Sequence, residues 1–600
     1  MTTTTSPPGP PTTTARSKVS NALTHPTRTI IKSFILWKLF LLAIAVGSTL
    51  VNDRAYDTSA DLLLIGNGEP LSVNDGNGVA ELLRNFGKRL VTRFTSWDAI
   101  YFVSSAKRGY VYEQEWAFGT GLVVCVRGVL RALQTLSLPL PLATSPTALA
   151  EATTALLLSN ASHLLAFLVL YHLILLLPLS CGSNSSSSSQ KRRKLALLTS
   201  LLHIFSPAGL FLSAPYAESS CALFSFLGWW FYARSCLSDG KDVTGRRREK
   251  ETGSGLTVKG DINLLLAGLS FGLATLFRSN GILNGLPFAW EVLGILSGLV
   301  TTSGGRGRVP LLKTLRRLIA LGLGGIFVAA GSIAPQTVAW LRYCPSGSLW
   351  LSNKFLSSSG VEAVSGTSGV SGNTGGYGGS GVGAGVSAGA GGGLEDLVAQ
   401  EEAREWCGAV VPSIYTFVQK HYWNVGFLRY WTLPNIPLFL LAAPMLAILV
   451  KSALDQLRQR PQQSSAVVNS DGKDKTSPLA PPTSGPTTSF ASEPSSDAVK
   501  SETVIHQNPE STTTTAQQRM QILISSAAAE QVLLAVLAVS SYHVQIITRI
   551  SSGYPLWYWW LAQQLIGGDK EKKLGKGIVV FMVMYAAIQG VLFTSFLPPA

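Results

Sequence analysis

Charged residues are scarce in this chain. They make up 14% of its 600 residues, against about 25% in an average soluble domain. This deficit excludes an ordinary soluble protein and indicates a chain surrounded by lipid. The formal net charge of +15 would favour nucleic-acid binding in a soluble protein. Here the basic clusters are short and fall between apolar runs, so we assign them to cytosolic loops and expect no nucleic-acid partner.

Cysteine is also rare, and its six copies are scattered. No two of them form a Cys-x-x-Cys pair, which argues against a zinc or thiol redox site. No cluster with metal-ligand spacing occurs elsewhere, so we expect neither a metal nor another cofactor. A cleavable signal peptide is missing as well, because residues 1–30 are rich in Thr, Pro and Ser. We interpret them as a disordered cytosolic tail.

Long apolar runs are what the sequence has instead. A membrane helix needs about 20 mostly apolar residues, and about eleven runs approach that length. They cover 34–51, 155–179, 195–213, 217–236, 263–277, 282–300, 318–340, 430–450, 521–542, 554–566 and 577–597. The run 554–566 is short enough to be re-entrant. The sequence therefore predicts an all-α polytopic membrane protein with about eleven transmembrane helices.

The stretch 122–142 is apolar enough to be a further span, but Arg127 and Arg131 lie near its middle. A central Arg costs about 2.5–3.5 kcal/mol on insertion scales. The two arginines are four residues apart and share one helical face. We therefore predict an amphipathic helix that lies on the membrane surface.

The basic clusters fix a topology for these spans. The N-terminal tail and the KRRK cluster at 191–194 are assigned to the cytosol, which requires an even number of crossings between them. Two large loops, 52–154 and 342–429, then share the opposite face. We divide the membrane-embedded part of the chain into a core at 31–460, which carries these loops, and C-terminal transmembrane helices at 519–600.

Two low-complexity segments are interpreted as insertions without a functional role. Residues 360–393 are a Gly/Ser/Val repeat, which behaves as a flexible coil inserted into the second large loop. Residues 461–518 are rich in Ser, Thr, Pro and Gln and are predicted to form a disordered cytosolic loop. We expect neither segment to hold a functional site.

The densest polar stretch between apolar runs is TRFTSWDAIYFVSSAKRGYVYEQEWAFG, at 92–119. Asp98, beside Trp97, is a candidate general base because the neighbouring aromatic rings partly shield it from water. The alternative is that Asp98 only caps the helix that carries those aromatics. Glu113 and Glu115 are second candidates, for which solvated surface acids are the competing interpretation.

Four later stretches place polar side chains at the ends of apolar runs on the same face. They contain Tyr216 and Glu218; Arg278, Ser279 and Asn280; Gln419, His421, Tyr422, Trp423, Asn424 and Arg429; and Gln545, Arg549 and Tyr554. Each could instead be an interfacial aromatic belt with snorkelling bases. A belt has no need of Asn, Gln or Asp, so we expect these side chains to meet Asp98 in one site.

These strings together resemble the GPI mannosyltransferase 2 family. The resemblance is carried by RFTSWDAIYFVSSAKRGYVYEQEWAFG, SPAGLFLSAPYAES, FRSNGILNG, YWNVGFLRYWTLPNIP and TRISSGYPLWYWWLA, in that order along the chain. It covers most of the membrane core from about residue 26 to residue 597 and omits the tail, the glycine-rich repeat and the Ser/Thr/Pro tract.

The resemblance implies a glycosyltransferase of the GT-C type, resident in the endoplasmic reticulum membrane with a lumenal active site. The donor would be dolichyl phosphate mannose, the acceptor a GPI-precursor glycolipid, and the new bond α1,6. Asp98 would match the catalytic carboxylate of the first lumenal loop, with Trp97 and Glu113 beside it. Candidates for binding the substrates and the leaving phosphate are Arg278, Asn280, His421, Trp423, Asn424, Arg429 and Arg549.

The implied lumenal location also bears on cysteine and on partners. Cys344 and Cys407 both lie in the second large loop, where an oxidising lumen permits a disulfide; two free thiols are the alternative. A small accessory membrane subunit is a further partner that the resemblance allows.

Three other functions remain open from the residues alone. One is a transporter of lipid-linked sugars, for which Glu291, within an apolar run, would be the distinctive residue. The second is a non-catalytic subunit. The third is another dolichol-phosphate-sugar-dependent transferase.

Overall fold

The computed structural model describes residues 23–51, 58–65, 79–136, 147–177, 186–237, 255–302, 311–344, 404–458 and 510–597. These residues form α-helices, 3-10 helices and connecting turns, and no strand occurs among them. The glycine-rich repeat, most of the N-terminal tail and most of the 461–518 loop lie outside the described residues. Two helices begin inside segments predicted to be disordered, at Pro26 and at Glu510.

Every predicted span has a helix in the structure. These helices are α2 (Pro26–Val51), α7 (Leu149–Leu176), α8 (Ser186–Ile204), α9 (Glu218–Leu237), α10 (Gly255–Phe277), α11 (Leu286–Thr302), α12 (Leu311–Tyr343), α16 (Ile436–Arg458), α17 (Glu510–Ser540), α19 (Pro555–Ile566) and α20 (Asp569–Thr594). Within the described residues, 7 are long and apolar enough to cross a membrane, namely α2, α7, α10, α12, α16, α17 and α20. The helical membrane fold is confirmed, although α19, with 12 residues, is short of a full span.

The most extensive helix contacts in the bundle run in a row, in which α7 packs on α9, α9 on α10 and α10 on α12. Small residues permit a close approach between two of them: a Cβ on Gly268 of α10 would lie 2.4 Å from the Cα of Gly324 in α12. Such small-residue contacts are typical of helix packing in lipid. Large aromatic side chains, including Trp229, Trp557 and Trp560, are fully buried within the bundle.

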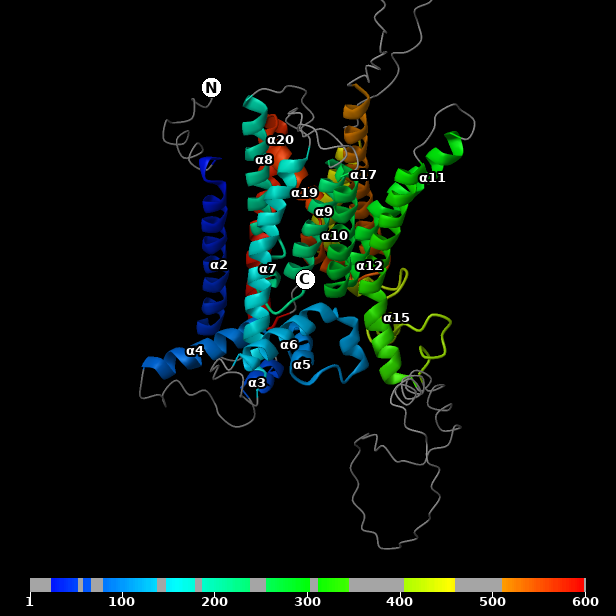
Figure 1. Ribbon diagram of the computed structural model, residues 1–600. Coiled ribbons are helices and arrows are strands. Elements are labelled where there is room, and N and C mark those ends of the chain that lie inside the picture. Colours follow the sequence, from blue (N-terminus) through cyan, green and yellow to red (C-terminus); the bar gives the residue numbers. More distant parts are fainter. Residues whose placement is uncertain are drawn as a thin grey trace, which may run out of the picture.

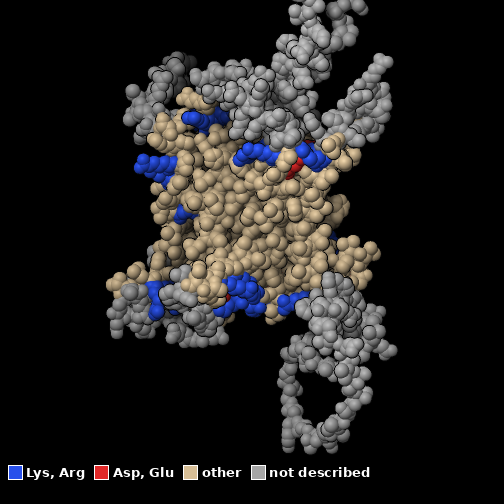
Figure 2. Space-filling view, in the orientation of Figure 1, with Lys and Arg blue, Asp and Glu red and all other residues tan. Residues whose placement is uncertain are grey.

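Short helices gather at one end of the upright bundle, opposite the N-terminal start of α2 (Figure 1). They are α3 (Ser59–Leu64), α4 (Val79–Phe94), α5 (Asp98–Arg108), α6 (Thr120–Thr135) and α15 (Ile414–His421). Figure 2 shows Lys and Arg side chains near both ends of the helical body, with a zone nearly free of charge between them. The body therefore has the charge distribution of a membrane protein.

The amphipathic helix predicted at 122–142 is present as α6, whose buried face includes Leu122, Val123 and Val126, while Val124 is exposed. It packs against α5, α7 and α10. The sequence analysis did not predict α4, which runs across the lower end of α2 toward α7 in Figure 1 and contacts both. That helix has exposed apolar side chains at Val79 and Leu83.

Candidate active site

Asp98 is the first residue of α5 and follows a strained backbone. Trp97 has a φ of 59°, a conformation that is costly for a bulky residue. Its indole stacks on Phe596 with ring centroids 5.1 Å apart. The Tyr216 hydroxyl donates to the Ser96 carbonyl oxygen at 3.3 Å. Contacts with Phe596 and with the turn before α9 therefore hold the backbone that presents Asp98.

The loop after α5 is closed by a buried carboxylate. Glu115 accepts hydrogen bonds from the backbone N–H groups of Val111 (2.7 Å) and Tyr112 (3.1 Å), and it pairs with Arg108. Glu115 is 2% exposed, so it acts as the internal brace of this loop. The loop then passes directly over the end of α10: a Cβ on Gly119 would lie 1.8 Å from the Phe277 carbonyl oxygen. Only glycine fits that contact.

A cavity of about 420 Å³ lies where these pieces meet. Its wall is built from α5, the loop before α6, the 3-10 helix η2 (Gly209–Leu212), η3 (Ser279–Gly285), α15 and the connection between α17 and α19, which contains α18 (Ile547–Ile550). The polar and aromatic residues that line it are Trp97, Asp98, Tyr101, Phe102, Phe118, Phe211, Phe277, Arg278, Ser279, Asn280, Tyr415, Gln419, Trp423, Tyr542, His543, Gln545 and Arg549. Segments up to about 450 residues apart in sequence therefore share one site.

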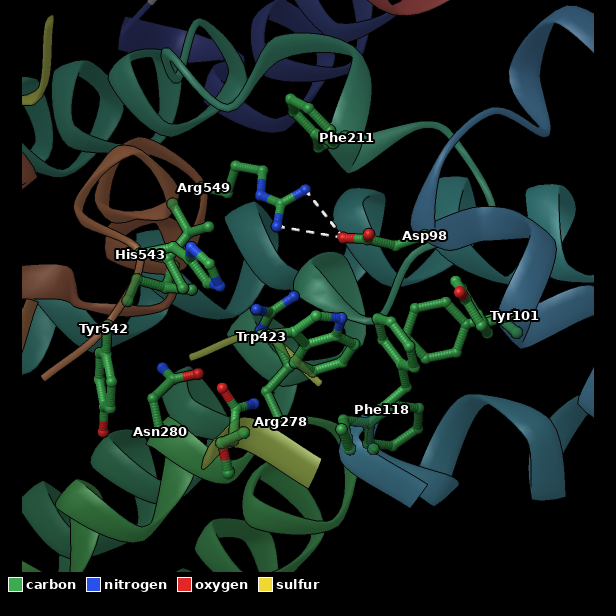
Figure 3. Close-up of a pocket in the computed structure, with 18 of the residues that line it drawn as sticks. Asp98, Tyr101, Phe118, Phe211, Arg278, Asn280, Trp423, Tyr542, His543 and Arg549 are labelled. Atoms are coloured by element: carbon green, nitrogen blue, oxygen red, sulfur yellow. Dashed lines mark hydrogen bonds and ion pairs between the residues drawn. The ribbon is translucent and has the colours of Figure 1, made fainter. Parts of the chain in front are cut away.

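Charged groups of opposite sign face each other in this cavity. Figure 3 shows Arg549 pointing at Asp98, and both Nη1 and Nη2 lie 3.2 Å from the same carboxylate oxygen, Oδ2. The Arg549 guanidinium also lies 4.7 Å above the Phe211 ring. On its other side, Arg549 Nε lies 3.8 Å from Oε1 of Glu218, and Arg278 Nη1 contacts the same Oε1 at 2.6 Å. Two arginines and two carboxylates thus form a continuous chain, the cavity charge chain, with no net charge.

The members of this chain differ in how far they are withdrawn from solvent. The Glu218 side chain is 0% exposed, those of Arg549 and Arg278 are 12% and 19% exposed, and that of Asp98 is 36% exposed. The exposed end of the chain is therefore the Asp98 carboxylate, and its foundation is Glu218. An incoming substrate meets Asp98 and the two arginines, while Glu218 stays behind them.

Burial and these charges shift the pKa values of neighbouring groups. Burial opposes the charge on Arg549, but the Asp98 and Glu218 carboxylates outweigh it and raise the pKa of the guanidinium. Burial, reinforced by Asp98, raises the pKa of the Tyr101 hydroxyl. Burial lowers the pKa of His543 below its usual value, against the opposing effect of Asp98. Arg549 therefore remains a cation, whereas Tyr101 and His543 favour their neutral forms at neutral pH.

The structure brings together six of the residues predicted to form the site: Trp97, Asp98, Arg278, Asn280, Trp423 and Arg549 all line the cavity. The other four do not line it. Glu113 instead accepts a hydrogen bond from Trp406 and lies 3.6 Å from Arg404. His421 stacks on Phe417, and it is exposed, as are Asn424 and Arg429. These four share polar stretches with cavity residues, but of the stretch around α15 only the face with Tyr415 and Gln419 and the later Trp423 reach the cavity.

Some cavity residues were missed by the sequence analysis. Tyr415 lies four residues before Gln419 on α15, and that spacing puts the two on one helical face. Glu218 lies in the stretch SPAGLFLSAPYAES, which carries the family resemblance, but no role in the site was predicted for it. His543 carried no signal, since it lies in a short connection.

Cys344 and Cys407 form a disulfide with Cα atoms 5.6 Å apart, as predicted. Around it lies a small buried cluster that includes Trp116, Trp406 and Ile414. The disulfide ties the end of α12 to the segment that leads into α15. It therefore fixes the wall that supplies Tyr415, Gln419 and Trp423.

Comparisons with known proteins decide the family. The family model described as Mannosyltransferase (PIG-V) matches residues 28–600. The chain belongs to the GPI mannosyltransferase 2 family. Curated proteins named GPI mannosyltransferase 2 from Chaetomium globosum and Gibberella zeae are 45% and 38% identical to it. The first match covers 96% of this chain and 97% of its relative, and the second covers 96% and 98%.

Membership of this family makes the protein a mannosyltransferase and a membrane enzyme. An oligosaccharyltransferase from Archaeoglobus fulgidus is a remote structural match, 10% identical, with a TM-score of 0.35 over 94% of this chain and 56% of that one. Glu291, the residue that would have distinguished a transporter, pairs with Arg317 inside the helix bundle at 2.8 Å. In the mannosyltransferase this residue has a structural partner and no opening toward the cavity.

Proposed function

We propose that this mannosyltransferase adds the second mannose, in α1,6 linkage, to the GPI-anchor precursor on the lumenal side of the endoplasmic reticulum membrane. The donor is dolichyl phosphate mannose and the acceptor is a mannosylated GPI-precursor glycolipid. One observation carries the proposal for the site. At one end of a helical membrane protein, a partly exposed carboxylate and two guanidinium groups share a cavity. A hydroxyl nucleophile needs a base, and a phosphate leaving group needs cations.

Asp98 is the general base in this mechanism. A β-linked donor that gives an α-linked product requires inversion, so a single displacement is sufficient. The acceptor 6-hydroxyl oxygen forms a bond to the anomeric carbon while the bond from that carbon to the phosphate oxygen breaks. The hydroxyl proton passes to the Asp98 carboxylate, and the bonding electron pair leaves on dolichyl phosphate. A positioned base of this kind contributes about 10² to 10⁴ in rate.

Arg278 and Arg549 are placed to hold the phosphate, because both line the cavity and both are largely withdrawn from water. Charge-assisted hydrogen bonds from a guanidinium to phosphate are stronger than neutral ones. The aromatic side chains of Tyr101, Phe118 and Trp423 give the cavity walls on which a sugar ring can pack. Asn280 adds an amide beside them. These residues together match a site for a mannosyl phosphate.

Complementation of cells that lack the second GPI mannose tests this function. Wild-type protein restores the glycolipid with two mannoses, and Asp98→Asn leaves the singly mannosylated precursor to accumulate. Asp261→Asn is the matched control, because Asp261 pairs with Arg316 away from the cavity at 2.6 Å. Rescue by Asp98→Asn would remove the catalytic role. Failure of the expressed wild type would remove this acceptor and linkage.

A further inference from the structure

Arg549 lies between two carboxylates, and its bonding to them is unequal. Both of its terminal nitrogens approach Asp98 Oδ2 at 3.2 Å, whereas its Nε lies 3.8 Å from Glu218 Oε1. The first contact is within hydrogen-bond range and the second is not. The guanidinium is thus bonded to the exposed acid and merely adjacent to the buried one. Figure 3 shows it extended toward Asp98 across the cavity.

The buried side of this arrangement is incompletely satisfied. Within the described residues, neither Arg549 Nε nor Glu218 Oε2 has a hydrogen-bond partner, although both atoms are buried. An unpaired buried polar atom is destabilising, and more so when it is charged. A short movement of the guanidinium toward Glu218 would bring Nε within hydrogen-bond range of Oε1, from which it is now 3.8 Å away. The contacts of Arg549 in this structure therefore favour Asp98 and leave its Nε unsatisfied.

The contact with Asp98 also restricts its role as a base. Oδ2 already accepts two guanidinium N–H groups, so only Oδ1 is left to take the proton of a sugar hydroxyl while Arg549 stays in place. The phosphate of the donor needs the same guanidinium. A second anion in the cavity therefore competes with Asp98 for Arg549, and the two requirements are met together if Arg549 changes partner.

We propose that Arg549 is exchanged between Asp98 and the donor phosphate, so that binding of a polyprenyl phosphate sugar releases Asp98 to act as the base. The inference rests on the proposed function for the identity of the donor. Glu218, which contacts Arg278 at 2.6 Å, keeps the guanidinium at the cavity wall during the exchange. A donor-free enzyme then holds its base in an ion pair.

Charge is conserved through this exchange. Before reaction, the donor phosphodiester has one negative charge and Asp98 has one. Transfer of the hydroxyl proton neutralises Asp98, and cleavage of the bond between the anomeric carbon and the phosphate oxygen leaves a second negative charge on dolichyl phosphate. One negative charge has moved from Asp98 to the phosphate, where Arg549 now lies. The guanidinium therefore follows the charge that the reaction displaces.

A binding measurement that needs no turnover tests the exchange. The probe is citronellyl phosphate, a short polyprenyl-type phosphate, titrated into the purified full-length protein in detergent with citronellol as the uncharged control. If Asp98 and phosphate compete for Arg549, Asp98→Asn tightens binding of the phosphate about tenfold, a change of about 1.4 kcal/mol. Binding equal to that of the wild type would overturn the inference.

A double-mutant cycle identifies Arg549 as the shared partner. In an Arg549→Met background the gain from Asp98→Asn disappears, because the cation for which the two anions compete is gone. A gain that persists in this background means that Asp98 repels phosphate directly, and the exchange is then wrong. Arg549→Lys replaces Arg549→Met if the latter fails to fold, with the gain reduced to less than half. The proposed function fails separately, through an active Asp98→Asn enzyme in the complementation assay.

Discussion

Two arginine–glutamate clusters in the described part of the chain, one at the cavity and one inside the bundle, are built differently. The bundle cluster joins Arg317 of α12 to Glu291 of α11. Arg317 Nε and Nη2 reach the two Glu291 oxygens at 2.8 and 3.1 Å, and the Tyr232 hydroxyl donates to Oε2 at 2.7 Å. Arg317 Nη2 also reaches the Ser235 hydroxyl at 3.4 Å. Each carboxylate oxygen has a partner, and the cluster is closed.

The cavity charge chain has the opposite character. Glu218 Oε2 and Arg549 Nε have no hydrogen-bond partner among the described residues, and Asp98 at its outer end is 36% exposed. A fully satisfied buried network stabilises one arrangement, whereas a partly satisfied one leaves room for another. The comparison distinguishes a charge cluster that joins two helices from one that is open to a ligand. Both consist of arginines and carboxylates, and in both the arginine and glutamate side chains are largely buried.

Replacing Arg549 or Arg317 with methionine should give the largest difference in activity between the two clusters. Arg549→Met removes a cation from the proposed phosphate site, and we expect mannosyl transfer to fall about 10²–10³-fold, as when a transition-state donor is deleted. Arg317→Met leaves turnover per folded molecule within about twofold, because its cluster does not touch the cavity. Initial rates of the purified proteins, normalised to the folded fraction, measure both. Equal losses in the two variants would show that the clusters do not differ in function.

Stability should show the reverse order. Removing Arg317 alone strands the Glu291 carboxylate in the bundle, a loss of about 3–5 kcal/mol. Replacing both partners, as Arg317→Met with Glu291→Leu, restores most of that loss, because a buried ion pair can be exchanged for apolar packing at little net cost. Tyr232 still has the Pro287 carbonyl oxygen at 3.4 Å as an acceptor. Thermal unfolding in detergent compares the single and double variants, and a double variant no more stable than the single one contradicts the structural role.

Hydrophobic pattern accounts for how well the fold was predicted. Runs of apolar residues located each of the long helices, and the two arginines on one face of 122–142 correctly made α6 an amphipathic helix. The pattern failed where helices are short or begin in polar sequence. The α4 helix follows a Gly/Asn-rich segment, and α17 begins at Glu510 within a Thr-rich stretch predicted to be disordered. Tertiary contacts stabilise such segments, and a single sequence does not contain them.

Site residues were predictable where a reactive side chain also lies on the cavity face of the membrane core. Asp98, Arg278 and Arg549 were found because they lie in polar stretches that adjoin apolar runs on one face and that carry the family resemblance. His421 was chosen for its chemistry, yet the helical face defined by Tyr415 and Gln419 excludes it from the cavity. The pairing of Arg549 with Asp98 spans 451 positions. No local sequence pattern predicts a contact between residues so far apart in the chain. The cavity charge chain could therefore be identified only from the structure.

The disulfide distinguishes the cavity wall beside α15 from the other cysteine positions. It fixes that wall, and among the described residues Cys125, Cys221 and Cys236 form no disulfide. Cys344→Ser with Cys407→Ser should lower stability by about 2–5 kcal/mol and raise KM more than it lowers kcat, because α15 carries side chains that line the cavity. Cys125→Ser is the matched control. A double variant with wild-type KM would show that the wall is held by packing alone.

The smallest expected effect is a change in the pH dependence of stability caused by His543, which lines the cavity near the cavity charge chain. Burial lowers its folded-state pKa below the usual value of about 6.5. As the pH falls through about 6.5 the unfolded chain takes up a proton before the folded one does, so the unfolded state is favoured by at most about 1.4 kcal/mol per pH unit. His543→Gln removes this contribution. Its melting temperature should therefore fall less than that of the wild type between pH 7.5 and pH 5.5, and parallel curves would show that His543 is equally basic in both states.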